Sequence, residues 1–163
     1  MSQILLLQSV NRAWHSSYFQ KQRLDYCFMI HTLNDESKQL LELLASQKNW
    51  EARYRQLLLL GKSAPVFPEI QRTENEIGGC QAKVWVSVEK NDNRFYIHAS
   101  SDARIVKALL LVLTQPLQGA TAEEIETFDA TAWMDSCKLS GHLNPSRVNG
   151  LFGVIDQVKA LTR

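Results

Sequence analysis

The sequence predicts an α+β domain with two layers, in which a three-stranded antiparallel sheet packs against helices. Apolar residues alternate over 83–88 and again over 95–99, which indicates two neighbouring strands. Apolar residues recur at helical spacing both before and after this stretch. Helices, then strands, then helices is an order typical of an α+β domain, because a parallel α/β sheet would need strands and helices to alternate along the chain.

The chain divides into two parts by its pattern. Residues 1–33 mix polar residues with scattered aromatics and hold no sustained apolar period, so we expect an N-terminal extension that is disordered or peripheral. Residues 34–163 carry the strong signals and are predicted to form the folded domain. A chain beginning at Met29 would still hold that domain, so residues 1–28 are expected to be dispensable.

Two helices are predicted before the sheet. Asn34 and Asp35 are residue types that favour a helix N-cap, so the first helix is expected over roughly 36–46. Asn49 is the predicted cap of a second helix, which we expect to end at Gly61 because glycine commonly follows the last turn of a helix.

The predicted sheet is built on a hairpin. The valines of 83–88 share one face, Trp85 takes the opposite face, and residues 91–93 have the composition of a turn. A short strand before Gly78 would complete the three strands. The two-layer arrangement would bury the large Trp85 side chain beneath helices.

Three helices are predicted after the sheet. The first follows Ser101 or Asp102, either of which is a suitable N-cap. Thr121 and Glu124 have the spacing of a capping box for the second helix. The last helix is expected to begin at 144–145, where Asn precedes Pro.

The bulk composition excludes some classes of function. The chain has 163 residues and a formal net charge of +1, so no broad electrostatic field would attract nucleic acid or an anionic membrane. The apolar run at 4–7 is far too short for a signal peptide or a membrane span. We therefore expect a cytoplasmic protein that binds neither nucleic acid nor membrane.

Cys80 is the candidate reactive residue among three widely spaced cysteines, which fit neither a disulfide framework nor a zinc pair. It follows Gly78 and Gly79, which leave the thiol unshielded and allow backbone conformations that other residues avoid. By local sequence alone, a reactive loop cysteine and a packed turn cysteine are equally good interpretations. Cys27 and Cys137 lack such a loop and are expected to be packed, unreactive thiols.

A set of short motifs resembles the SufE family. In the first half of the domain these motifs are Trp-Glu at 50–51, Tyr-Arg at 54–55, Leu-Gly-Lys at 60–62, Gly-Cys-Gln at 79–81 and Val-Trp at 84–85. In the second half they are Ser-Asp-Ala-Arg-Ile-Val-Lys at 101–107 and His-Leu-Asn-Pro-Ser-Arg-Val-Asn-Gly-Leu at 142–151. The match runs from about Asn49 to Leu161. Each motif alone is weak, but the ordered set is specific.

The resemblance implies a SufE/NifU-like fold, shared with iron–sulfur scaffold proteins, and a catalytic Cys80 that carries a persulfide intermediate. The matching cysteine of the family accepts sulfur from a cysteine desulfurase, stimulates that enzyme and relays sulfur towards iron–sulfur cluster assembly or another sulfur-using pathway. The implied partners are the desulfurase and a downstream sulfur acceptor or scaffold protein. The chain would then be a sulfur-transfer partner rather than an enzyme, with no cofactor or metal of its own. The resemblance also suggests that the free protein keeps this thiol in an apolar cavity, which would raise its pKa.

Two departures from the family pattern leave the branch of the family open. Ala82-Lys83 stands where the family usually has a polar pair, and Ala108 stands where it usually has glycine. Motifs within 54–62 resemble the Csd-type branch, whereas residues within 128–133 resemble SufE proper. Neither departure touches the thiol itself.

Five further residues are expected to support Cys80. Thiol exchange needs thiolate character, which positive groups or a helix N-terminus supply. Gly79 and Gln81 belong to the loop, while Lys83, Arg147 and the helix N-terminus near Asp102 are the candidate positive groups. For each of these charges the competing interpretation is a solvated surface residue.

Two other classes of function remain as alternatives. An iron–sulfur cluster scaffold would need several thiolates, and only Cys80 lies near the motif. A free-standing thiol enzyme would need a base such as His98, whose position beside Tyr96, opposite the apolar face, favours an ordinary surface histidine. His142 precedes the last helix and is assigned a role in shaping the loop, with no proton chemistry.

Overall fold

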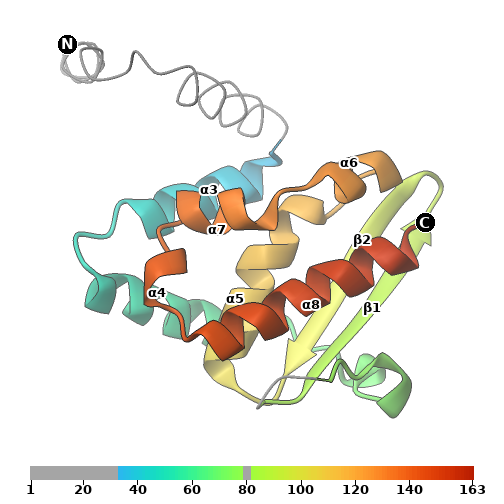
Figure 1. Ribbon diagram of the computed structural model, residues 1–163, viewed down its shortest axis with the longest axis horizontal. Coiled ribbons are helices and arrows are strands. Elements are labelled where there is room, and N and C mark those ends of the chain that lie inside the picture. Colours follow the sequence, from blue (N-terminus) through green and yellow to red (C-terminus); the bar gives the residue numbers. More distant parts are fainter. Residues whose placement is uncertain (1–32, 79–81) are drawn as a thin grey trace, which may run out of the picture. The chain divides into compact units, whose positions relative to one another are not determined.

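The computed structural model describes residues 33–78 and 82–163 (Figure 1). Asn34–Arg163 form one compact unit. Its longer elements are α3 (Asp35–Ala45), α4 (Trp50–Ser63), β1 (Val84–Asn91), β2 (Arg94–Ser101), α5 (Arg104–Thr114), α6 (Ala122–Thr127), α7 (Ala130–Ser136) and α8 (Pro145–Leu161). Short 3₁₀ turns join them at η2 (Pro68–Ile70), η3 (Thr73–Asn75), η4 (Gln115–Leu117) and η5 (Ser140–His142).

Side-chain caps begin three of the helices where the sequence predicts them. The Asn34 side chain accepts a hydrogen bond of 2.8 Å from the backbone N–H of Ser37, and Asn49 caps α4 in the same way. Thr121 and Glu124 form the predicted capping box at α6. Each cap satisfies an N–H group that the first helical turn would otherwise leave without a partner.

The predicted boundaries of α4 and α5 are wrong, for reasons of tertiary packing. Gly61 lies inside α4 rather than after it, and a Cβ at this position would collide with the backbone carbonyl oxygen of Arg104 in α5. Helix α5 has Ala103 as its N-cap, with no side-chain cap, because Ser101 and Asp102 are bonded elsewhere.

The sheet has two strands in the described part of the chain, and the predicted third strand is absent from it. Strands β1 and β2 pair antiparallel, from Val84 opposite Ser101 to Asn91 opposite Arg94. Before Gly78 there is only an isolated bridge between Glu76 and Trp85. The chain cannot run extended for longer, because η3 coils it immediately before this bridge.

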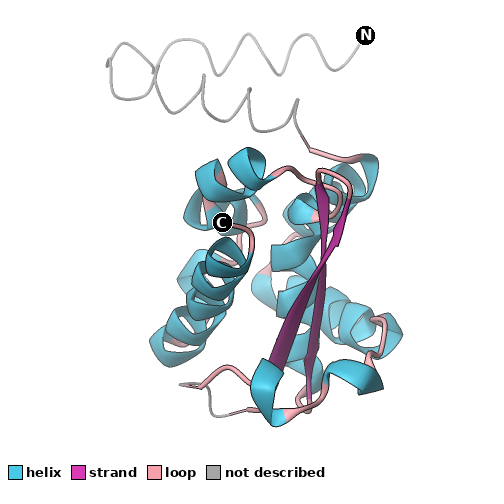
Figure 2. Ribbon diagram, turned by 90° about the vertical axis from the view of Figure 1, so that its right-hand side faces the viewer, coloured by secondary structure: helices cyan, strands magenta, loops and turns pink. Residues whose placement is uncertain are grey.

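The two faces of the hairpin are covered differently (Figure 2). Val84, Val86 and Ile97 are buried on the face that contacts the long helices, with α5 against β2 and α8 against β1. Trp85 on the other face is only 9% exposed, and the contacts of β1 there include the short turns η2 and η3. The arrangement is thus α+β with helices packed on an antiparallel hairpin, and Trp85 is buried without a second full helical layer.

Helix α5 runs through the centre of the domain. Its buried residues are Val106, Ala108, Leu109, Leu110, Val112, Leu113 and Thr114. Trp133 of α7 is fully buried against it, and the indole N–H donates to the backbone oxygen of Val112 at 2.8 Å. Burial of this aromatic side chain with its one polar atom satisfied stabilises the α5–α7 contact. None of the helices within the two described ranges is long and apolar enough to cross a membrane.

Candidate functional site

The predicted reactive loop is defined here by its two flanks. Gly79, Cys80 and Gln81 lie outside the described residues, as does the side chain of Arg147. The described chain stops at Gly78 and resumes at Ala82, and Gly78 is exposed. A side chain at Gly78 would meet no other atom within 4 Å, so the loop is open to solvent at this point.

A backbone hydrogen bond closes the base of the loop. The N–H of Ile77 donates to the carbonyl oxygen of Val84 at 2.8 Å, next to the bridge between Glu76 and Trp85. The segment 78–83 therefore leaves and re-enters the edge of β1 at neighbouring points. This holds both ends of the segment in register with the sheet.

A second set of hydrogen bonds, which we call the Lys83 clasp, fixes the outgoing flank. The Asp102 carboxylate accepts from the backbone N–H of Lys83 at 3.0 Å, and the Ser101 hydroxyl donates to the backbone oxygen of Lys83 at 2.7 Å. The N–H of Asp102 also approaches that oxygen at 3.4 Å. Of the predicted site residues with described side chains, Lys83 and Asp102 are thus brought together, through the main chain of Lys83.

The clasp changes the interpretation of Asp102. The sequence suggested that the region near Asp102 supplies positive charge from a helix N-terminus, but this residue contributes a carboxylate at the base of the loop. Its carboxylate is engaged in a hydrogen bond to the main chain of Lys83, which fixes the outgoing flank of the loop. Sequence inspection missed Ser101 as a clasp residue, because a serine and an aspartate before a helix have the same local signature as a helix cap.

His142 and Trp50 join α4 to the segment that leads into α8. Their rings stack with centroids 4.6 Å apart and an angle of 13° between planes. The stack holds His142 against α4, and its role in shaping the loop stays a prediction. The stack also fixes the path of the chain just before the motif at 144–147, where α8 begins.

His98 is held by two contacts, neither of which requires a catalytic role for the imidazole. Its ring stacks on Phe67 at 4.7 Å, and its Nε2 lies 3.7 Å from the carboxylate of Glu89. Its side chain is 29% exposed, on the strand face that also carries Tyr96. This position agrees with the prediction of a strand histidine near the surface.

Cys137 is a buried structural thiol. It is fully buried, and burial raises the pKa of its thiol from 9.0 to about 12. It therefore stays protonated at neutral pH and is a poor nucleophile, as the sequence predicted. Among the described residues, no group of three or more His, Cys, Asp or Glu side chains is arranged to hold a metal ion.

Comparisons with known proteins agree with the motifs. The family model described as SufE, an Fe-S metabolism associated domain, matches residues 38–162. A Haemophilus influenzae protein named as an uncharacterized SufE-like protein is 36% identical over 124 residues, which span 75% of this chain and 98% of that protein. The solution structure of a hypothetical protein from Thermus thermophilus has a TM-score of 0.65 at 23% identity, over 80% of this chain and 96% of that one. The last likeness is evidence of a shared fold.

Proposed function

Because the chain belongs to the SufE family, we propose that it is a sulfur acceptor that takes persulfide sulfur from a cysteine desulfurase onto Cys80. It then relays this sulfur to a downstream acceptor or scaffold protein, towards iron–sulfur cluster assembly or another sulfur-using pathway. The observation that carries the proposal is the closed base of the segment 78–83, since hydrogen bonds fix both flanks of the segment whose sequence contains the Gly-Cys-Gln motif.

The proposed transfer is a thiol exchange. The Cys80 thiolate attacks the outer sulfur of the persulfide on the desulfurase cysteine, a new S–S bond forms, and the donor cysteine leaves as a thiolate. One S–S bond forms and one breaks, so no oxidant, metal or cofactor of this chain takes part. The chain itself is then a partner in another protein's reaction rather than an enzyme, and its proposed setting is the reducing cytoplasm.

The fixed flanks favour such a transfer for a geometric reason. A thiol that must reach a persulfide in another protein needs an exposed segment, but each ordered residue in that segment costs conformational entropy. Fastening Ile77 to Val84 and Lys83 to Asp102 limits the free part of the segment to a few residues. The thiol is then presented at a defined edge of the protein, which raises its effective concentration once the partner docks.

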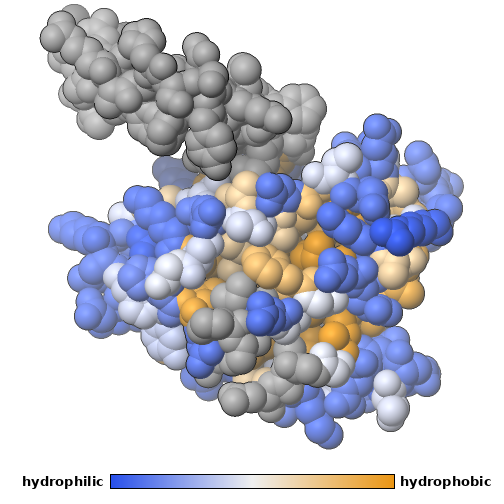
Figure 3. Space-filling view, viewed as in Figure 1, coloured by the Kyte–Doolittle hydropathy of each residue, from blue (hydrophilic) through white to orange (hydrophobic). Residues whose placement is uncertain are grey.

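The surface beside β1 and α8 suits a protein partner. In Figure 3, apolar residues gather at the centre of the face that carries α8 and hydrophilic residues lie around its margin. An apolar centre with a polar rim is the ordinary composition of a protein interface.

The proposal is tested by measuring alanine release from cysteine by a cysteine desulfurase with and without this protein. Cys80→Ser should abolish the stimulation, because a hydroxyl is a poor acceptor for sulfur, while docking measured by pull-down should survive. Cys27→Ser is the matched control and should stimulate fully. Intact-mass analysis after incubation with desulfurase and cysteine should show one added sulfur atom, which a reductant removes. Full stimulation by the Cys80→Ser protein would end the sulfur-acceptor proposal.

A further inference from the structure

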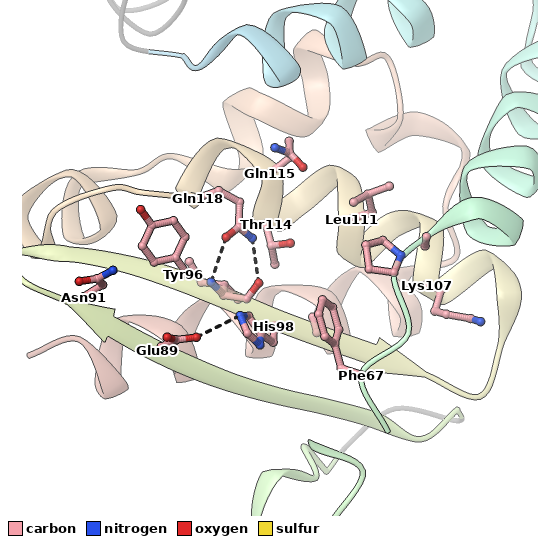
Figure 4. A pocket seen from close by; sticks show the side chains of 14 residues that line it. Phe67, Glu89, Asn91, Tyr96, His98, Lys107, Leu111, Thr114, Gln115 and Gln118 are labelled. Atoms are coloured by element: carbon pink, nitrogen blue, oxygen red, sulfur yellow. Dashed lines mark hydrogen bonds and ion pairs between the residues drawn. The ribbon is translucent and has the colours of Figure 1, made fainter. Parts of the chain in front are cut away.

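A cavity lies along the outer edge of β2, on residues that the proposed sulfur-acceptor loop does not include. Its volume is about 440 Å³, and it opens between α5, the hairpin and the linker that follows α4 (Figure 4). The residues that define its walls are Pro65 and Phe67 from the linker, Tyr96 and Ala99 from β2, and Lys107 and Leu111 from α5.

Successive residues of β2 point their backbone N–H and carbonyl groups alternately toward β1 and away from it. Phe95 turns its backbone groups away from β1, donating to Ala120 at 2.9 Å and accepting from Gly119 at 2.8 Å. Ile97 does the same with the side chain of Gln118, whose amide donates to its oxygen at 2.8 Å and accepts from its N–H at 3.1 Å (dashed lines in Figure 4). The outer edge of β2 is thus closed at two successive outward-facing positions.

Ala99 is the next position in the same alternation, and it is left open. Its N–H and carbonyl oxygen point away from β1, since the period of a strand is two residues. Ala99 lines the cavity and is half-buried, and no partner for these two backbone groups exists among the described residues. A partly buried donor and acceptor side by side favour any ligand that offers a matching acceptor and donor.

We propose that this cavity binds a short extended peptide segment of a partner protein, whose main chain pairs with the N–H and carbonyl oxygen of Ala99. The Gln118 side chain provides the model for this pairing. It is a planar amide, and it makes both hydrogen bonds to the outward N–H and carbonyl oxygen of Ile97. A peptide main chain continues this row with the same chemical group at the spacing of a strand. Recognition of this kind is made by backbone groups and tolerates changes in the side chains of the peptide.

The walls of the cavity fit a neutral segment. The Phe67–His98 stack and the Tyr96 ring lie on one face of the sheet, so they offer aromatic surfaces to side chains on that face of the bound strand. Lys107 and Glu89 lie at opposite ends of the cavity, and each is a single charge (Figure 4). This balance does not favour a polyanion such as a nucleotide, which would require a cluster of positive groups.

The open part of the edge is short. Gln118 and Ala120 close the edge on one side of Ala99, and β2 itself ends two residues later at Ser101. A short open edge gives weak and reversible binding, and it also avoids the uncontrolled pairing to which a long open edge is prone.

The first test uses nuclear magnetic resonance with the full chain labelled with ¹⁵N. The probe is acetyl-Thr-Val-Thr-Val-amide, a neutral peptide with high strand propensity, and the control is the same peptide with its backbone amides N-methylated. We expect the Ala99 amide signal to move downfield and saturate with the probe in the millimolar range, and to stay unchanged with the control. No shift at Ala99, or an equal shift with the N-methylated peptide, would overturn the proposal.

Two variants extend the test in opposite directions. Ala99→Pro removes the outward N–H while the strand neighbours keep their bonds to β1, so peptide binding should be lost. Gln118→Ala uncovers the backbone pair of Ile97 and lengthens the open edge, so the same peptide should bind about fivefold tighter or more. A Gln118→Ala protein that still unfolds cooperatively but binds no tighter counts against the proposal. If Ala99→Pro does not fold, the comparison of the two peptides on the natural chain decides.

Discussion

At Gly61, helix α4 approaches α5 so closely that a side chain has no space. The carbonyl oxygen of Arg104, which this glycine contacts, belongs to the first turn of α5, immediately after the Lys83 clasp. The glycine therefore sets the distance between two helices and, through α5, the position of the flank that holds the proposed reactive loop.

Gly61→Ala should lower the free energy of unfolding by about 1–3 kcal/mol, because the added methyl group forces the backbones of α4 and α5 apart. Gly153→Ala is the matched control, since Gly153 lies inside α8 and a Cβ there would meet no atom within 4 Å. That control should be neutral or stabilise the protein by up to about 1 kcal/mol, from helix propensity alone. Urea denaturation of both variants checks this, and equal effects would mean that the α4–α5 contact adjusts freely.

Cys137 predicts a dependence of stability on alkaline pH. Burial raises the pKa of its thiol from 9.0 to about 12, so between these values the unfolded chain ionises this group and the folded chain does not. The thiol therefore disfavours folding progressively as the pH rises above 9.0, and it has no such effect below that pH. Cys137→Ala removes the group. The difference in unfolding free energy between the natural chain and this variant should shrink between pH 8 and pH 11, and a constant difference would show that the thiol ionises equally in both states.

At the scale of elements, the outgoing flank of the proposed reactive loop is held by the clasp between β1 and the start of α5. The two bonds from Ser101 and Asp102 to the main chain of Lys83 extend the pairing of β1 with β2 by one residue beyond Val84. A bridge at Glu76 and a hydrogen bond at Ile77 secure the other flank. A few hydrogen bonds and one isolated bridge thus hold the two flanks of the loop, where the sequence predicted a complete third strand on one side.

Asp102→Ala should cost about 0.5–1.5 kcal/mol of stability, because the hydrogen bond to Lys83 is exposed to solvent and its loss leaves an accessible N–H. It should also reduce the stimulation of a desulfurase, if Cys80 is the acceptor. Asp102→Asn is the informative control, since its amide oxygen accepts the same hydrogen bond without the charge. Restored stability and stimulation in Asp102→Asn would identify the clasp as the cause, whereas an Asn variant as impaired as the Ala variant would point to the charge.

Local rules predicted the elements well where a helix begins with its own cap. Asn34, Asn49 and Thr121 form caps from residues within one turn, so the sequence alone contains the information. Gly61 and Asp102 have the local signatures of a helix end and a helix cap, but tertiary partners give them other roles. The position of the loop could be predicted from its glycines, whereas the bonds that fasten it depend on residues distant in the sequence.

On the scale of the whole molecule, the family match and the folded unit cover the same part of the chain. The family model matches residues 38–162, and the Haemophilus influenzae relative aligns along 98% of its own length with 75% of this chain. Residues 1–33 lie outside the family match, which suggests that the domain does not need them.

A chain that begins at Met29 should therefore unfold cooperatively and melt within a few degrees of the full chain. Differential scanning calorimetry of both chains at the same concentration measures this. Loss of cooperative unfolding in the shorter chain would show that residues 1–28 contribute to the core. If both chains melt alike, comparing their desulfurase stimulation would reveal whether the extension serves a partner instead.

The clasp has a consequence for how this protein can diverge. Its hydrogen bonds at position 83 involve only the N–H and the carbonyl oxygen, and the Lys83 side chain is exposed. Every amino acid except proline offers both groups, so mutations at this position leave the fastening intact. The charge or size of a side chain next to the proposed reactive loop can therefore change in evolution, and with it the surface offered to the proposed desulfurase, while the clasp that holds the loop is kept.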